Sequence, residues 1–272
     1  MNILSIIGAR PQFIKAAPVS RALHQVAHET LLHTGQHYDR EMSQIFFYEL
    51  HIPKPDYNLG IGSGSHGWQT GQMLIRIEEV LLQERPDWVL VYGDTNSTLA
   101  GALAAVKLHI PVAHVEAGLR SFNRAMPEEH NRVLTDHAAD LLFCPTPNAV
   151  ELLAREGVTS GVHLTGDVMY DAYLYNAQLA EQRADILSKL NLAPKTYALA
   201  TVHRPSNTDD PDRLRGILDA LDSLNTSVIL PAHPRTRQAM EKIAYRPGGN
   251  LRIIDPVGYL DMLMLEQHAT HI

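Results

Sequence analysis

The chain of 272 residues has a single cysteine, Cys144, which excludes an internal disulfide and a thiolate metal site. Because Cys144 ends the apolar run 141–143, we expect its thiol to be an inert part of the core. One unpaired thiol fits a reducing compartment, so we expect a cytoplasmic protein. Histidine is plentiful, but none of the fifteen stands in a zinc spacing such as His-Glu-x-x-His, and we expect no metal.

Basic residues are also few relative to acidic ones. The 23 lysines and arginines against 30 acids give a net charge of −7, which offers no electrostatic case for nucleic acid or an anionic membrane surface. No apolar run reaches the ~20 residues that span a bilayer, and residues 3–7 have the pattern of a strand directly after Met1. We therefore expect neither a membrane span nor a signal peptide.

The pattern that is present is strand, turn and helix, repeated. Short apolar runs at 3–7, 88–92, 112–115, 140–144 and 162–165 alternate with helical stretches such as 71–84. This alternation predicts a parallel sheet with right-handed crossovers. Residues 43–67 contain two prolines and four glycines, and we expect a loop there.

A second series follows a long helical stretch at 170–190. It has strands at 197–202, 227–230 and 251–254, and helices at 209–224, 236–245 and 259–268. We predict the α/β class, with two doubly wound, Rossmann-like parallel-sheet domains (1–167 and 168–272) that face a cleft. If this alternation of strands and helices continues, residues 269–272 begin another strand. We therefore expect the second domain to be incomplete and the chain to be a fragment.

Two acids follow neighbouring strands of the first domain. Asp94 stands in Gly93-Asp94-Thr95 after the strand 88–92, and Glu116 stands in His114-Val115-Glu116 at the end of the next one. Ligands of parallel sheets bind beyond the carboxyl ends of the strands, so both acids are expected to point into one crevice. The alternative is that Asp94 is only a helix N-cap and Glu116 only a surface charge.

Two cations follow the first strand. In the segment 8–15, Gly8 permits a close backbone approach, Pro11 suits a first helical turn, and helix N-terminal amides attract phosphate. Arg10 and Lys15 beside that terminus suit a diphosphate, and the alternative is an ordinary turn with solvated charges. The segment is neither a Gly-x-Gly-x-x-Gly fingerprint nor a P-loop, so we expect neither a nicotinamide cofactor nor ATP.

Three further segments carry titratable groups. Glu128 and Glu129 fall in a predicted first helical turn, where at least one of them is expected to be structural. His203-Arg204 ends the first strand of the second domain, and we favour a functional proton carrier there. His233, after the next strand, stays open between a structural and a functional role.

These motifs, in this order, resemble the non-hydrolysing UDP-N-acetylglucosamine 2-epimerase family over the whole chain. The matching segments are Gly8-x-Arg10-Pro11-x-x-x-Lys15, Gly93-Asp94-Thr95, His114-Val115-Glu116-Ala117-Gly118-Leu119-Arg120, Pro127-Glu128-Glu129-x-Asn131-Arg132, Thr165-Gly166-Asp167 and His203-Arg204. The resemblance implies a fold like that of GT-B glycosyltransferases and a homodimer in surface-polysaccharide synthesis. The implied reaction converts UDP-GlcNAc to UDP-ManNAc through elimination and re-addition of UDP, without NAD or metal.

The resemblance also implies roles for individual residues. Four positions correspond to the family's catalytic set, namely Asp94, Glu116, Glu128 and His203. The implied substrate-binding positions are Arg10, Lys15, Arg204, His233, Val257 and Met262. The family's next strand leads to a diphosphate-gripping loop that this sequence does not reach, so we expect the 272-residue chain to be inactive.

Two other functions stay open at this stage. A hydrolysing relative would release UDP and free ManNAc. A GT-B-type glycosyltransferase, or a nucleotide-sugar-binding module, would not break the bond between C2 and its hydrogen. Exchange of that hydrogen with solvent distinguishes the epimerases from the transferase and the passive binder.

Overall fold

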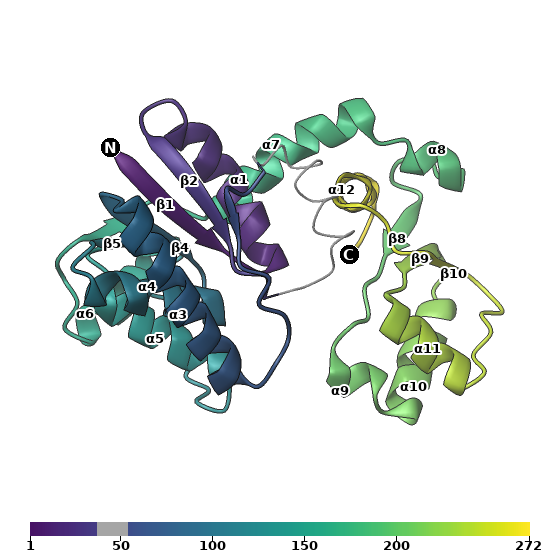
Figure 1. Cartoon of the computed structure of the whole chain (residues 1–272). Coiled ribbons are helices and arrows are strands. Elements are labelled where there is room, and N and C mark those ends of the chain that lie inside the picture. Colours follow the sequence, from purple (N-terminus) through teal and green to yellow (C-terminus); the bar gives the residue numbers. More distant parts are fainter. Residues whose placement is uncertain (37–53) are drawn as a thin grey trace. The chain divides into compact units, whose positions relative to one another are not determined.

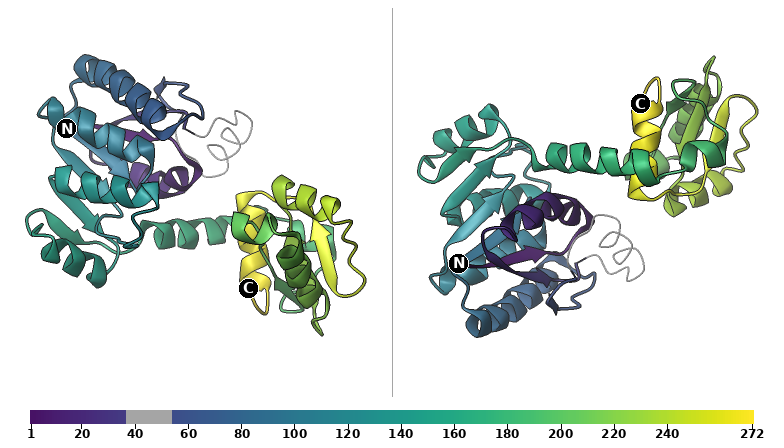
Figure 2. Two further views of the ribbon diagram at one scale, coloured as in Figure 1. Left: turned by 90° about the horizontal axis from the view of Figure 1, so that it is seen from below. Right: turned by 90° about the horizontal axis from the view of Figure 1, so that it is seen from above.

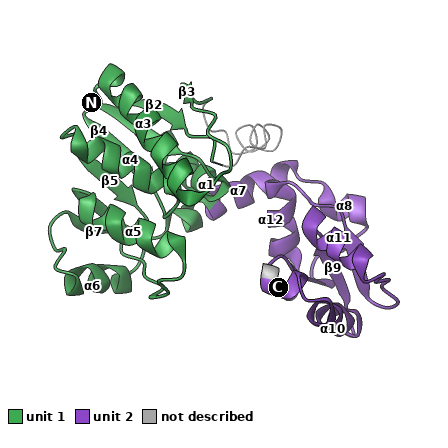
Figure 3. Ribbon diagram, turned by 60° about the horizontal axis from the view of Figure 1, so that its bottom comes forward, with its two compact units in different colours: residues 1–172 green, residues 173–272 purple. Residues whose placement is uncertain are grey.

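The structure, a computed structural model, describes residues 1–36 and 54–272. It divides into two compact units, Met1–Ala172 and Tyr173–Ile272 (Figure 3). The division falls within helix α7 (Val168–Arg183), which begins directly after the boundary predicted at residue 167. None of the helices in the described part of the chain is long and apolar enough to cross a membrane.

The first unit contains a seven-stranded parallel sheet (Figure 1). In spatial order the strands are β3 (Tyr57–Asn58), β2 (His28–His33), β1 (Asn2–Ile7), β4 (Trp88–Tyr92), β5 (Val112–Val115), β6 (Leu141–Cys144) and β7 (Val162–Leu164). The chain winds outward from β1 in one direction and from β4 in the other. The loops after β1 and β4 therefore diverge, and this point of reversal is where doubly wound sheets bind ligands.

Helices cover both faces of this sheet. They are α1 (Arg10–Leu23), α3 (His66–Glu84), α4 (Asn96–Lys107), α5 (Pro127–Ala138) and α6 (Pro147–Arg155). Helices α3 and α4 lie side by side on one face, as the further views in Figure 2 also show.

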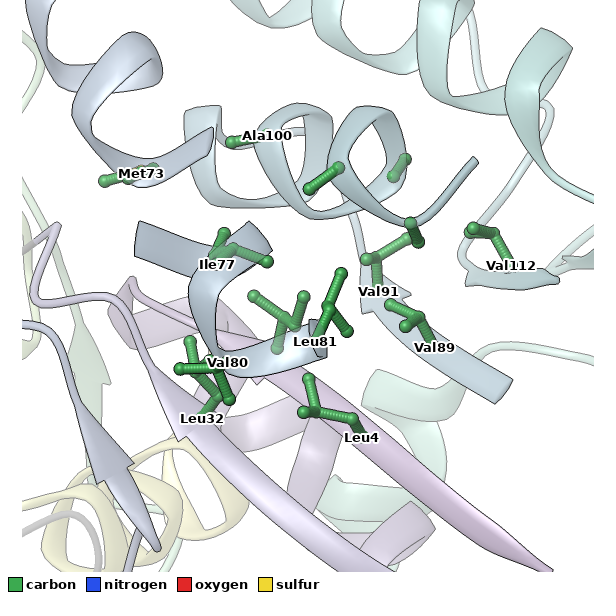
Figure 4. Packing of buried hydrophobic residues seen from close by; sticks show 14 of the residues in the cluster. Leu4, Leu32, Met73, Ile77, Val80, Leu81, Val89, Val91, Ala100 and Val112 are labelled. Carbon is green, nitrogen blue, oxygen red and sulfur yellow. The ribbon is translucent and has the colours of Figure 1, made fainter. Parts of the chain in front are cut away.

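The core under α3 and α4 follows from two periodicities (Figure 4). Alternate strand residues such as Leu4 and Val91 point to this face, and every fourth residue of α3, at Met73, Ile77 and Leu81, packs on them. Helix α4 packs closely on the sheet because it contains four alanines and one glycine, Gly101. A Cβ added at Gly101 would lie 2.7 Å from the Ile6 side chain.

The opposite face of the sheet carries α1 and a cavity of about 500 Å³. Its walls are mainly apolar, with Leu90, Val115 and Phe143 from the strands and Val19 from α1. Glu116 is one of its few charged lining residues. Because the walls are so largely apolar, this cavity does not suit a diphosphate.

The second unit contains a three-stranded parallel sheet with helices on both faces. The strands, in spatial order, are β10 (Leu251–Ile254), β9 (Ser227–Pro231) and β8 (Tyr197–Leu199). The helices after α7 are α8 (Ile186–Leu190), α9 (Pro205–Thr208), α10 (Pro211–Asp222), α11 (Pro234–Lys242) and α12 (Tyr259–His268). One core lies under α10 and α11, and the other joins α8 and α12 to the opposite face. His271 forms a parallel bridge with Ala198 of β8, as predicted for the strand that begins at 269–272.

The prediction of two doubly wound parallel-sheet units is confirmed, while several elements differ from expectation. Strand β2 was not predicted, although its residues from Glu29 to His33 are buried. Residues 43–53 of the expected loop lie outside the described residues, and the remainder contains β3 and the start of α3. The single helix expected at 170–190 is two helices, because a break at residues 184–185 turns the chain so that Ile186 enters the core.

Cys144 is buried, which confirms its predicted place in the core. Burial raises the pKa of its thiol to about 11 from the usual 9.0, so about a hundredfold less thiolate is present near neutral pH. We expect iodoacetamide at pH 8 to label native Cys144 at least about a hundredfold more slowly than the chain in urea, by mass spectrometry. Equal rates in both conditions would contradict this prediction.

Candidate active site

A largely buried ion pair lies at the point where the strand order reverses. Lys15, in the second turn of α1, places its ammonium 2.6 Å from a carboxylate oxygen of Glu116, which follows β5. Their side chains are only 10% and 18% exposed. The interpretation of Glu116 as a solvated surface charge is therefore wrong, and one predicted cation holds one predicted acid in place.

The backbone of Glu116 adopts an unusual conformation. Its φ is +71°, a left-handed value that residues other than glycine seldom adopt. The carbonyl of Phe143 in β6 accepts hydrogen bonds from the amides of Glu116 and Ala117, both at 3.1 Å. The left-handed conformation of Glu116 turns the chain sharply at the end of β5. Backbone conformations of this kind are concentrated at functional sites.

Gly93 lies against the same ion pair. Its φ is +63°, and a Cβ added there would lie 3.0 Å from the Lys15 nitrogen. Gly93 therefore serves two purposes, because it permits the turn after β4 and leaves room for the ammonium.

Gln12, which sequence reasoning did not single out, ties these loops together. Its buried side-chain oxygen accepts hydrogen bonds from the amides of Gly8 (2.8 Å) and Ala9 (3.0 Å), and its nitrogen donates to the Tyr92 carbonyl (2.8 Å). Two of the amides considered for phosphate binding are thus satisfied within the chain. Arg10, exposed at the start of α1, is the cation of this segment that is open to solvent. The sequence signal was a glutamine at the third helical position.

Asp94 forms an ion pair with Arg132 of α5. The N-cap of α4 is Thr95, whose hydroxyl accepts a hydrogen bond from the Thr98 amide, so the interpretation of Asp94 as the cap is wrong. The Asp94 carbonyl accepts a hydrogen bond from the Asn131 side chain at 2.9 Å. Helix α5 therefore holds both the backbone and the side chain of Asp94.

The two glutamates at the start of α5 differ in their surroundings. Glu129 is 5% exposed and accepts hydrogen bonds from the Ser121 amide and hydroxyl, the Phe122 amide and Arg132. Glu128 is partly exposed and has no hydrogen-bond or ion-pair partner among the described residues. It lies three and four residues before Asn131 and Arg132, on the helix face that contacts the Asp94 loop. Glu129 is thus the structural member of the pair.

Glu129 should make the stability of the first unit sensitive to acid. Its burial raises the pKa, but hydrogen bonds from Ser121 and Phe122 and the charge of Arg132 together hold the pKa below its usual 4.5. A lowered folded pKa contributes stability that is present above the unfolded value and is lost as the pH falls through the folded one. We expect the difference in unfolding free energy between the wild type and Glu129→Gln to shrink steadily from pH 6 to pH 3.

Tryptophan fluorescence during urea unfolding measures this difference, because both tryptophans, Trp68 and Trp88, lie in the first unit. Glu151→Gln is a matched control, since Glu151 is an exposed glutamate of α6. A difference for Glu129→Gln that does not change with pH would contradict the prediction.

The predicted residues of the second unit lie in its loops and on its core. His203 and Arg204 are exposed between β8 and α9, and the Thr236 hydroxyl anchors the preceding Val202 carbonyl at 2.8 Å. The His233 ring accepts a hydrogen bond from the Arg235 amide at 3.3 Å and caps α11, which favours a structural role for it. Val257 and Met262 are partly buried against the core near α12.

The structure thus brings Lys15, Asp94, Glu116 and Glu128 to one edge of the first sheet, and Arg10 begins the helix that follows β1. Among residues 1–36 and 54–272, no group of three or more His, Cys, Asp and Glu side chains could hold a metal ion.

Comparison with known proteins gives one consistent family. Residues 21–272 match the family model described as UDP-N-acetylglucosamine 2-epimerase. A UDP-N-acetylglucosamine 2-epimerase homolog of Methanococcus maripaludis is 56% identical over all of this chain and 78% of the relative. A UDP-2,3-diacetamido-2,3-dideoxy-D-glucuronate 2-epimerase of Pseudomonas aeruginosa is 53% identical over 99% of this chain and 76% of the relative.

A solved structure gives the same result at the level of the fold. The crystal structure of Methanocaldococcus jannaschii UDP-GlcNAc 2-epimerase, in complex with UDP-GlcNAc and UDP, has a TM-score of 0.86 and 46% identity. The match covers 99% of this chain and 77% of that one.

Proposed function

The chain belongs to the UDP-N-acetylglucosamine 2-epimerase family, and from this premise we propose that it inverts C2 of UDP-GlcNAc to give UDP-ManNAc. In the proposed reaction a base removes the C2 proton while UDP leaves C1, which yields 2-acetamidoglucal and UDP. UDP then adds back to C1, and C2 receives a proton on the other face. The overall change needs no net oxidant or reductant.

The observation that carries this proposal is the set of three carboxylates at one sheet edge. Asp94 and Glu116 are each held by one cation, whereas Glu128 has no partner among the described residues. Proton transfer at C2 needs positioned acid and base groups, which the acids supply. We assign to Arg10 and Lys15 the stabilisation of the negative charge on the departing diphosphate. From the second unit we assign His203 and Arg204 to the reaction.

Exchange of hydrogen at C2 tests the proposal. UDP-GlcNAc is incubated in heavy water with the 272-residue chain and, in parallel, with a form extended at its C terminus by the corresponding segment of the Methanococcus maripaludis relative. We expect at least the extended form to yield UDP-ManNAc that carries deuterium at C2, detected by NMR. Product with only protium at C2 would exclude the mechanism, and free ManNAc with UDP would indicate a hydrolysing enzyme instead.

A second substrate has specific support. The 53% identical relative is named for a UDP sugar with a second acetamido group and a carboxylate, and its identity exceeds the 46% of the Methanocaldococcus jannaschii enzyme. The chemistry at C2 would be the same for both sugars. Comparing kcat/KM for UDP-GlcNAc and for UDP-2,3-diacetamido-2,3-dideoxy-D-glucuronate in the same exchange assay decides between them.

A further inference from the structure

His114 of β5 belongs to the matched sequence segment but has no role in the proposed chemistry. Its side chain is completely buried on the sheet face that α5 covers. One ring nitrogen, Nε2, lies 2.7 Å from the carbonyl oxygen of Gly93, and the other, Nδ1, lies 2.7 Å from a carboxylate oxygen of Asp136. A carbonyl oxygen only accepts hydrogen bonds, so Nε2 carries a hydrogen and donates to Gly93.

Asp136 is well placed to orient this ring. It is buried on α5, and its second oxygen accepts hydrogen bonds from Arg120 (2.6 Å) and the Gly118 amide (3.1 Å). Burial raises the pKa of Asp136, but the hydrogen bonds and charges of His114 and Arg120 outweigh it and keep the carboxyl ionised. An ionised Asp136 accepts a hydrogen bond from Nδ1, which fixes the plane of the ring and the direction of Nε2.

Both polar backbone groups of Gly93 are therefore held by β5. Its amide donates to the Val115 carbonyl at 2.9 Å, and its carbonyl accepts from His114. The next residue is Asp94, one of the proposed acids. Gly93 has a left-handed φ, and because it lacks a Cβ its backbone is less restricted sterically than that of other residues. The His114 hydrogen bond thus holds the peptide group that precedes Asp94, while Asn131 of α5 holds the carbonyl group that follows it.

We propose that His114 is a positioning residue that, oriented by Asp136, clamps the Gly93 carbonyl and thereby aims the Asp94 carboxylate. This inference rests on the proposed function for the reaction that Asp94 serves. The histidine touches no substrate in this role. A displacement of about 1 Å at a reacting group costs about 10²-fold in rate, which sets the scale of the expected effect.

Two amide variants separate this role from a merely structural one. The side-chain nitrogen of glutamine in His114→Gln can reach the position of Nε2 and keep the bond to Gly93. The shorter side chain in His114→Asn reaches only the position of Nδ1, so it keeps the bond to Asp136 and loses the one to Gly93. We expect kcat for C2 exchange to fall about 10²-fold in His114→Asn, with KM changed less than about threefold, and to be largely retained in His114→Gln.

Thr135→Val is the matched control. Thr135 precedes Asp136 on α5 and is fully buried, and its hydroxyl has no hydrogen-bond partner among the described residues. The variant should therefore exchange C2 hydrogen at the wild-type rate. A folded His114→Asn with wild-type kcat, or a His114→Gln that is as impaired as His114→Asn, would overturn the proposal.

A readout that needs no turnover distinguishes this inference from the proposed function. In the 272-residue chain, the NMR signal of the Asp94 amide should be displaced or broadened in His114→Asn and should stay near its wild-type position in His114→Gln and Thr135→Val. If neither wild-type form exchanges C2 hydrogen, the proposed function fails, and the amide signals still decide the role of His114. An unmoved Asp94 signal in His114→Asn would refute the clamp.

Discussion

Glu116→Gln should lower the rate of C2 exchange by about 10²–10⁴-fold, the usual contribution of a positioned acid or base. Glutamine has nearly the same shape but cannot take a proton, and it leaves the Lys15 ammonium without its carboxylate. The affinity for UDP should change far less than the rate. The rate is measured by NMR in heavy water, and the affinity by calorimetry, on the form with exchange activity.

Matched variants locate the effect at the sheet edge. Asp94→Asn and His203→Asn are expected to behave like Glu116→Gln, whereas Arg10→Ala should mainly weaken UDP binding. Lys15→Ala should do both, because its ammonium also holds Glu116. Glu151→Gln makes the same chemical change on the exposed surface of α6 and should leave the rate unaltered. Near-native exchange in Glu116→Gln would return Glu116 to a structural role.

Arg120→Met should lower the free energy of unfolding of the first unit by about 3–5 kcal/mol, the cost of removing one partner of a buried ion pair. The Arg120 side chain is only 1% exposed and contacts two carboxylates, Asp136 at 2.6 Å and Glu156 at 2.8 Å. Methionine fills similar space but leaves the fully buried Asp136 carboxylate without the guanidinium that pairs with it. Urea unfolding followed by tryptophan fluorescence measures the loss.

The control for this prediction is Arg155→Met. Arg155 pairs with Glu151 at 3.5 Å, and both side chains are more than 60% exposed, so the change should cost no more than about 1 kcal/mol. Similar losses in the two variants would show that the buried network contributes nothing beyond an ordinary surface pair.

Much of the fold could be predicted because it depends on short-range pattern. The strands at 88–92, 112–115 and 251–254 and the helix at 259–268 were predicted to the residue, since apolar runs and their flanking breakers are local signals. Strand β2 gave a weaker signal because its buried residues, on both faces of the sheet, include Glu29 and Thr30 as well as leucines. The acid of β2 is tolerated there because the Ser5 hydroxyl of β1 donates to it at 2.5 Å.

The sequence by itself determined two series of parallel strands and helices and, through the strand ends, that Asp94 and Glu116 would share an edge. That follows because parallel strands deliver their carboxyl ends to the same side of a sheet. Only the tertiary structure decided which charges meet. Lys15 holds Glu116, Arg132 holds Asp94, Glu129 rather than Glu128 is structural, and His114 clamps Gly93. Three of these pairs, Lys15–Glu116, Arg132–Asp94 and His114–Gly93, join residues 101, 38 and 21 positions apart in the sequence. Their pairing depends on how helices and strands pack together rather than on local sequence.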